Sequence, residues 1–206
     1  MDAFYFTGGT ALSLFFLKHR QSHDLDFFTA TEELIVPFSH KLESQLNCIA
    51  LSVERKRTFN SFVELYVSSD IDTTIIHLAL DSPFRFEPPF DAKEFPALKV
   101  DNLIDMASNK LLALFSRATL RDFIDVYFLI KKYYSKTHLI ERARQKDPGF
   151  DLYWLAVAFE RINEYQNDSP DLLMLTTTCS MQELKEFFDA WRQEISEANL
   201  NPDTGR

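Results

Sequence analysis

The sequence predicts an α+β fold, with a mixed β-sheet and flanking helices followed by a helical C-terminal domain. Two observations support this prediction. Runs with strand-like alternation occupy much of the first hundred residues, and the apolar spacing changes to that of helices near Asp101. We therefore expect two domains within the 206 residues, at 1–100 and 101–206.

Five strands are expected in the first domain, because each run is apolar throughout or alternates with period two. These strands cover 3–7, 24–29, 48–58, 61–68 and 73–81. The last three flank Phe59-Asn60 and Ser69–Asp72, two connections of hairpin length. The next segment, 82–96, contains four prolines and is expected to be a loop.

Two helices are expected between these strands. Leu12, Phe15 and Phe16 form an apolar stripe that predicts a helix over 9–19, and a second helix is expected over 31–46, interrupted early by Pro37. The second domain shows a break near Ala118-Thr119, where Thr119 could cap the helix that follows. Its expected helices are 102–117, 119–134, 136–146, 151–164 and 180–197.

The composition excludes several classes of protein. With 46% hydrophobic residues and 20 Phe, the chain can build a large core. Cys48 and Cys179 lie far apart, which favours a reducing compartment, and the sequence has no C-x-x-C pair for zinc. The longest apolar run, 11–17, is too short to cross a membrane, and the N-terminus does not resemble a signal peptide. We expect a cytoplasmic protein with no membrane partner.

The net charge of −9 argues against broad binding to nucleic acid, which requires a positive surface. A local basic patch remains compatible with this charge, although such runs are usually solvated faces. The candidates are Arg55, Lys56, Arg57, Lys131, Lys132, Lys136, Arg142, Arg144 and Lys146.

The most informative segment is 7–29, TGGTALSLFFLKHRQSHDLDFFT, which joins a Gly-Gly turn, a helix and a strand. Asp24 and Asp26 should share one face of that strand, about 6–7 Å apart. Two such carboxylates suit Mg²⁺ (or Mn²⁺), which prefers oxygen ligands. Gly8 and Gly9 let backbone N–H groups approach a phosphate, although an ordinary strand-to-helix turn is the plainer interpretation.

The string GGTALSL…HRQSHDLDFFT resembles the AbiEii/AbiGii-type toxin family of the DNA polymerase β-like nucleotidyltransferase superfamily. The later segment LIDMASNKLLALFSRATLRDFIDVYFLI (103–130) is similar to that family's C-terminal motif. The resemblance implies a nucleotidyltransferase-like fold and Mg²⁺-dependent transfer of NMP from an NTP to an acceptor hydroxyl, for which it suggests a tRNA 3′ end. It also implies the toxin of a toxin–antitoxin or phage-defence system, with the antitoxin on a separate chain. Family members often carry residues ahead of the first strand.

The resemblance also implies roles for particular residues. It places Asp24, Asp26, Lys110 and Asp122 in catalysis, with the two strand acids as the metal ligands. Around the nucleotide it places Gly8, Gly9, Thr10, Arg20, Ser22, Arg117 and Asp125. The plainer interpretation of the later group is that Lys110 and Arg117 pair with Asp122 and Asp125 and staple two helices together. Arg121 and His19 are expected to face solvent.

A third acid is expected on the strand 73–81, near position 77, but this chain has His77 there. Asp81 has the same parity and is our candidate for the catalytic acid. The alternatives are that His77 supplies a ligand or base, or that the function is absent. Two other classes of function therefore stay open. One is a degenerate member that binds a nucleotide or a partner, and the other is a kinase-like enzyme or phosphodiesterase that uses the same acids.

Overall fold

The computed structural model describes residues 3–200, with side chains up to Glu197, and divides them into two compact units. The sheet unit comprises 3–16 and 21–106, and the helical unit comprises 17–20 and 107–200. The division therefore falls after Met106, whereas the sequence analysis placed it after residue 100. The predicted α+β class is confirmed, because a mixed sheet is combined with helices.

The sheet has seven strands in the order β3-β4-β5-β2-β1-β7-β6. Its strands are β1 (Tyr5–Thr7), β2 (Leu25–Thr29), β3 (Ser52–Phe59), β4 (Phe62–Ser68), β5 (Thr73–Leu80), β6 (Phe90–Asp91) and β7 (Lys99–Val100). The pairs β2–β5 and β1–β7 are parallel and the other pairs are antiparallel. All five predicted strands are present. β6 and β7 were missed because two residues are too few to show a period.

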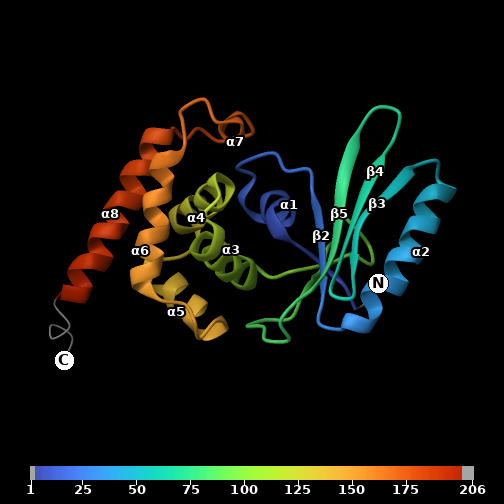
Figure 1. The fold of residues 1–206 in the computed structure, drawn as a ribbon, viewed down its shortest axis with the longest axis horizontal. Coiled ribbons are helices and arrows are strands. Elements are labelled where there is room, and N and C mark those ends of the chain that lie inside the picture. Colours follow the sequence, from blue (N-terminus) through green and yellow to red (C-terminus); the bar gives the residue numbers. More distant parts are fainter. Residues whose placement is uncertain (1–2, 201–206) are drawn as a thin grey trace. The chain divides into compact units, whose positions relative to one another are not determined.

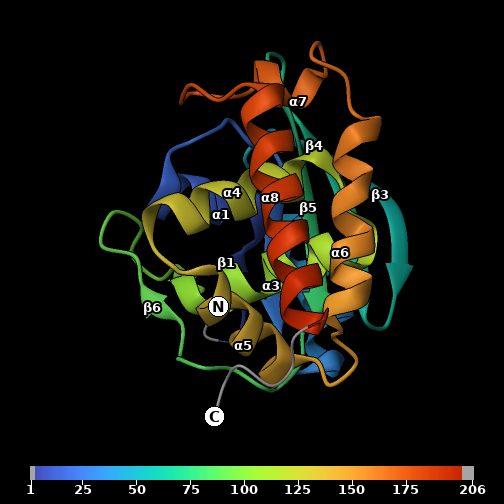
Figure 2. The same cartoon turned by 90° about the vertical axis from the view of Figure 1, so that its left-hand side faces the viewer.

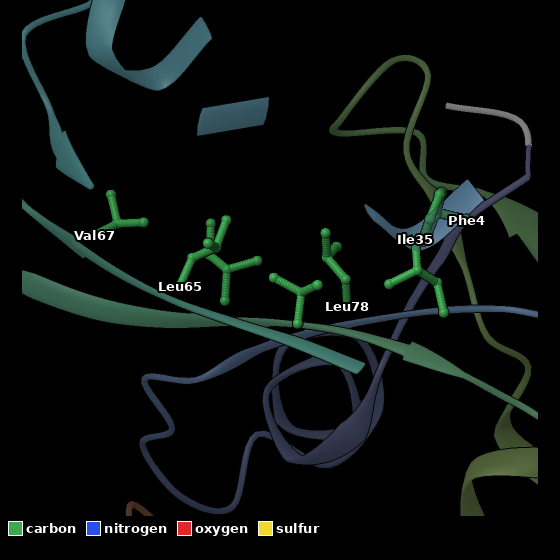
Figure 3. Close-up of a cluster of buried hydrophobic side chains, with 7 residues drawn as sticks. Phe4, Ile35, Leu65, Val67 and Leu78 are labelled. Carbon is green, nitrogen blue, oxygen red and sulfur yellow. The ribbon is translucent and has the colours of Figure 1, made fainter. Parts of the chain in front are cut away.

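Two helices flank the sheet, with α1 (Gly8–Leu12) on one face and α2 (Ile35–Cys48) on the other (Figure 1). The face toward α2 carries a closed apolar cluster, since Val63, Leu65 and Leu78 are fully buried. Figure 3 shows Leu65, Val67 and Leu78 on the same side of their strands. Leu25 and Phe27 of β2 pack against this cluster, so their neighbour Asp26 points to the opposite face.

The first two helices differ from prediction in detail. α1 is followed by a π-helical segment, Ser13–Leu17, and Lys18 then takes a positive φ of 53°, which ends the helical path. The predicted interruption at Pro37 is wrong. α2 runs through Pro37, because a proline in the first turn of a helix has no N–H bond to lose.

Five of the six described α-helices after residue 101 agree closely with the sequence prediction, and α7 was not predicted. They are α3 (Leu103–Arg117), α4 (Leu120–Lys132), α5 (Lys136–Lys146), α6 (Leu152–Glu160), α7 (Pro170–Leu173) and α8 (Met181–Leu200). α6 and α8 lie side by side (Figures 1 and 2), with Phe159, Phe188 and Trp191 packed between them. The predicted break near Ala118 is confirmed, since Ala118 has a positive φ of 49°. Among the described residues, no helix has the length and apolar character needed to cross a membrane.

Candidate functional site

Gly8 lies close against the side chain of Asp26 in the sheet unit. Gly8 has a φ of +75°, and a Cβ placed there would lie 2.0 Å from Asp26 Oδ2. Both the backbone conformation and the space therefore require glycine at this position. The pairing of Thr7 with Asp26 in the antiparallel strands β1 and β2 creates this contact, because it sets the turn directly against the carboxylate.

Asp24 immediately precedes β2 and is partly exposed, as is Asp26. The hydroxyl of Thr10 donates to the backbone carbonyl of Asp24 and hydrogen-bonds with Ser22 Oγ at 2.8 Å. Gly8, Gly9 and Thr10 all belong to α1, so these contacts tie the start of that helix to the segment that leads into β2. The structure thus gathers Gly8, Thr10, Ser22, Asp24 and Asp26 in one region of the sheet unit.

His77 lies beside Asp26 on the neighbouring strand β5, with 2.9 Å between His77 Nδ1 and Asp26 Oδ1. The hydrogen bond to Asp26 raises the pKa of His77 above its ordinary value; burial opposes this shift, and the charges of Asp26, Asp24 and Glu64 add to it. The negative charges of Asp24 and Asp26 therefore both act on the imidazole ring of His77. Position 77 thus adjoins the acid pair, as expected, but with imidazole in place of a carboxylate.

Asp81 contacts other groups. Tyr5 donates its phenolic hydroxyl to Asp81 Oδ2, and Arg85 Nη1 lies 3.4 Å from the same oxygen. Arg85 also lies over the Tyr5 ring and pairs with buried Asp101. The structure therefore brings His77, and not Asp81, into contact with Asp26. Asp81 is the carboxylate that fastens the segment after β5 to β1.

Glu64 is the residue that the sequence analysis missed. It lies on β4 directly opposite His77, with 3.4 Å between Glu64 Oε2 and His77 Nε2. Its own strand alternates, since Val63 and Leu65 are buried in the apolar cluster while Glu64 faces the other way. The alternation was visible in the sequence, but the sequence analysis gave Glu64 no role.

The helical unit gathers the second group of predicted residues around Asp125. This carboxylate is fully buried and contacts Lys110 Nζ at 2.7 Å, His19 Nε2 at 2.7 Å and Arg20 Nε at 2.7 Å. Burial alone would raise the pKa of Asp125, but the charge of Lys110 and the hydrogen bonds from His19 and Arg20 hold it well below its ordinary value. The expectation that His19 faces solvent is wrong, because the side chain is 1% exposed and hydrogen-bonds with the buried carboxylate of Asp125.

Asp122 forms the second acid of the same cluster. Arg117 binds it through two nitrogens, with Nε at 2.7 Å and Nη2 at 2.9 Å, and Lys110 Nζ lies 3.8 Å away. Burial would raise the pKa of Asp122, but Arg117 and Lys110 outweigh burial and lower it. Thr119 occupies the N-cap position as predicted, yet its hydroxyl donates to Asp122 Oδ2 at 2.6 Å and does not cap an N–H group. Arg121 is half exposed and lies 3.8 Å from Asp171.

The predicted residues therefore form two clusters, one in each unit. Gly8, Thr10, Ser22, Asp24 and Asp26 belong to the sheet unit. Arg20, Lys110, Arg117, Asp122 and Asp125 belong to the helical unit. The ion pairs of Lys110 and Arg117 on α3 with Asp122 and Asp125 on α4 are those expected if these residues hold the two helices together. That Lys110 reaches a phosphate bound near Gly9 stays a prediction.

Four of the nine candidate basic residues contact acidic side chains. On β3, Arg55 contacts Glu43, Lys56 contacts Glu54, and Arg57 lies 3.7 Å from Glu64. In the helical unit, Lys131 and Lys136 lie over the Phe187 ring, and Lys136 also contacts Glu194. These contacts are those expected of solvated faces.

Mg²⁺ fits the donor set of Asp24 and Asp26. No group of three or more His, Cys, Asp or Glu side chains within the described part of the chain is arranged to hold a metal. Mg²⁺ is commonly held by one or two carboxylates, with waters and substrate phosphates as its other ligands. Two partly exposed carboxylates beside a glycine turn therefore suit a metal that arrives with a nucleotide.

The mixed sheet, the glycine turn before a helix, and the two acids at the start of the next strand, one just before it and one on it, define a nucleotidyltransferase class of protein. The family model described as "Nucleotidyl transferase AbiEii toxin, Type IV TA system" matches residues 1–197, and the chain belongs to this family. It is thus a nucleotidyltransferase toxin of a toxin–antitoxin system, a class that has a nucleotide substrate and an antitoxin. Among curated proteins, none matches the chain significantly.

Solved structures share the fold. A nucleotidyltransferase candidate from Helicobacter pylori matches with a TM-score of 0.59 and 18% identity, over 95% of this chain and 87% of the other. JHP933 from Helicobacter pylori matches with a TM-score of 0.53 and 18% identity, over 98% of this chain and 88% of the other. MenT4, a nucleotidyltransferase toxin from Mycobacterium tuberculosis, matches with a TM-score of 0.53 and 13% identity, over 95% of this chain and 79% of the other. At these identities the likeness concerns the fold alone.

Proposed function

We propose that this chain transfers NMP from an NTP to an acceptor hydroxyl in a reaction that depends on Mg²⁺ or Mn²⁺. The observation that carries the proposal is the contact between Gly8 and Asp26. Only a residue without a Cβ fits there, so the carboxylate lies against the backbone of the turn at which α1 begins. Nucleotide phosphates and a cation would meet at such a junction, which presents N–H groups beside carboxylate oxygens.

Asp24 and Asp26 would hold the metal. When bound, a divalent cation supplies neutralisation of the negative charge on the phosphates. The residues of this chain have their own tasks around it. The Gly8-Gly9 turn admits the phosphates, while the 2.8 Å hydrogen bond between Thr10 and Ser22 holds Ser22 next to the turn, where the Ser22 hydroxyl can exchange its bond with Thr10 for one to a phosphate oxygen.

Lys110 and Asp122 enter the proposal through the family motif. Lys110 would contact the triphosphate, with Asp122 holding it in position and Arg20, Arg117 and Asp125 around it. Within the cluster, Lys110, Arg20 and Arg117 bind the two acids Asp122 and Asp125. Arg is a poor substitute for Lys110, since its planar fork differs from a compact ammonium.

The acceptor is proposed to be an RNA, with the tRNA 3′ end as the first to test. This part of the proposal rests on the family resemblance, as does the phage-defence role, whereas the cytoplasmic site of action rests on the composition. The antitoxin is expected on a separate chain.

A second function, nucleotide binding without turnover, is favoured by one observation. His77 occupies the place of the third acid and lies 2.9 Å from Asp26 Oδ1, one of the four carboxylate oxygens available to a metal. A degenerate site would keep its affinity for a nucleotide and lose transfer.

The experiment is incubation of the purified protein with Mg²⁺, total RNA and each of the four NTPs, labelled at the α-phosphate. Label on RNA supports nucleotidyl transfer. Binding without incorporation supports the degenerate site. In a parallel incubation with NTPs labelled at the γ-phosphate, transfer of label supports a kinase-like enzyme. If the protein neither binds nor transfers any NTP, the proposal is wrong.

A further inference from the structure

Three titratable side chains lie in one row across the centre of the sheet. Asp26 on β2 faces His77 on β5, and His77 faces Glu64 on β4, each as direct partners in the strand register. The ring of His77 uses both nitrogens, since Nδ1 lies 2.9 Å from Asp26 Oδ1 and Nε2 lies 3.4 Å from Glu64 Oε2. One imidazole therefore joins two carboxylates on neighbouring strands.

The row is partly shielded from solvent. The side chains of Asp26, His77 and Glu64 are 24%, 22% and 15% exposed. β4 is an interior strand, and a charged residue in the middle of such a strand is uncommon unless it has a partner. The exposed Arg57 lies 3.7 Å from Glu64 Oε1, so the closer of the two contacts of Glu64 is the one with His77.

We propose that Glu64 is a positioning residue, which acts through His77 to hold the carboxylate of Asp26 in the orientation that the reaction requires. The inference rests on the proposed function. The Glu64–His77 pair takes the place of the acid expected at position 77, with the carboxylate moved one strand further along the sheet. Outer partners that orient a metal-binding side chain typically change activity or metal affinity by about 10–100-fold when they are removed.

The alternative is a purely structural cross-strand pair. Such a pair would contribute about 0.2–1 kcal/mol to stability and nothing to the orientation of Asp26. The two roles differ in what happens when position 77 regains a carboxylate. An aspartate at position 77 would adjoin Asp26 directly, and Glu64 could then no longer orient Asp26 through the imidazole ring.

The test compares Glu64→Gln with Glu54→Gln, a matched change on β3 where Glu54 is 67% exposed and contacts Lys56. We expect Glu64→Gln to lower kcat for NMP transfer about tenfold with little change in KM for the NTP, and Glu54→Gln to change neither. In the His77→Asp background, Glu64→Gln should have no further effect. An unchanged kcat in Glu64→Gln, or the same loss in both backgrounds, would overturn the proposal.

A second readout does not depend on turnover. The His77 ring N–H that faces Asp26 should give a slowly exchanging signal in nitrogen-15 spectra of the wild-type protein and of Glu54→Gln, and this signal should be lost in Glu64→Gln. Retention of the signal in Glu64→Gln overturns the positioning role. Loss of the signal in a protein that transfers no NMP would leave the Glu64 contact established and the proposed reaction wrong.

Discussion

The two charged clusters of the molecule are built in opposite ways. In the sheet unit, Asp24, Asp26 and Glu64 surround one histidine, and the row of Asp26, His77 and Glu64 is 15–24% exposed. In the helical unit, Asp122 and Asp125 are 0% exposed and are bound by Lys110, Arg20 and Arg117. The first cluster has an excess of acid beside a glycine turn, whereas the buried acids of the second are matched by cations.

This difference separates two physical tasks. A buried acid is tolerated only with hydrogen-bonded cations, and the acids of the helical cluster have such partners without any ligand. Neighbouring acids that are partly solvated repel one another, and a bound cation relieves that repulsion. The sheet cluster is therefore the better candidate for metal and phosphate chemistry, while the helical cluster secures the fold even if Lys110 also reaches the nucleotide.

The largest effect is expected from the acid pair. Asp24→Asn and Asp26→Asn should each lower NMP transfer about 10³-fold or more, because loss of a metal ligand removes several kcal/mol of transition-state stabilisation. Transfer rates should be measured against Asp70→Asn, a change in an exposed turn of the same unit. Asp24 and Asp26 are not metal ligands if all three variants keep the wild-type rate.

The next effect concerns stability. Asp125→Ala leaves Lys110 and Arg20 without their shared carboxylate in a buried place, and should cost about 3–5 kcal/mol in the free energy of unfolding. Asp171→Ala, which removes a partly exposed acid 3.8 Å from Arg121, should cost less than about 1 kcal/mol. Urea denaturation of both variants measures the difference. Equal costs would show that burial does not distinguish the two acids.

Gly8→Ala should destabilise the sheet unit by about 1–3 kcal/mol, because alanine resists a φ of +75°. It should also abolish transfer, since the added Cβ meets the Asp26 carboxylate. Gly149→Ala is the matched control. Its nearest neighbour is Asp147 Oδ1 at 3.2 Å, so it should leave transfer unchanged. Thermal melts and transfer rates test both, and wild-type transfer by Gly8→Ala would contradict the contact.

The smallest effect is a dependence on pH. The pKa of Asp122 is lowered in the folded protein, so its contribution to stability is present above the unfolded pKa of about 4 and is lost as pH falls through the folded value. The gap in unfolding free energy between wild type and Asp122→Asn should therefore shrink as pH falls below about 4. Urea titrations from pH 7 to pH 3 measure this gap, and a constant gap would contradict the ion pairs.

Much of the fold could be predicted from the sequence, because the apolar period of a long segment indicates whether it forms a helix or a strand. The pairing of Glu64 with His77 was legible too. A loop of Ser69–Asp72 pairs Ser68 with Thr73, and counting back along the two strands sets Glu64 opposite His77. The hairpin was predicted, but the count was not made.

Other features depend on contacts that a single sequence does not record. Asp26 meets His77 only because β2 pairs in parallel with β5, and no local pattern gives that register. His19 was misjudged because its polar character favours solvent, whereas buried Asp125 requires it inside. Asp81 has the parity of His77, yet Tyr5 and Arg85 engage it at the end of β5.

The most direct test of the account is the shift in melting temperature that Mg²⁺ and NTP together produce, measured for wild type, Asp24→Asn and Asp26→Asn. Without ligand, Asp24→Asn should melt at or slightly above the wild-type temperature because it relieves repulsion, while Asp26→Asn should melt slightly lower because it weakens the bond with His77. Wild type should gain stability from the ligands, and both variants should gain little. A full wild-type shift in both variants would show that Asp24 and Asp26 do not bind the metal–nucleotide complex.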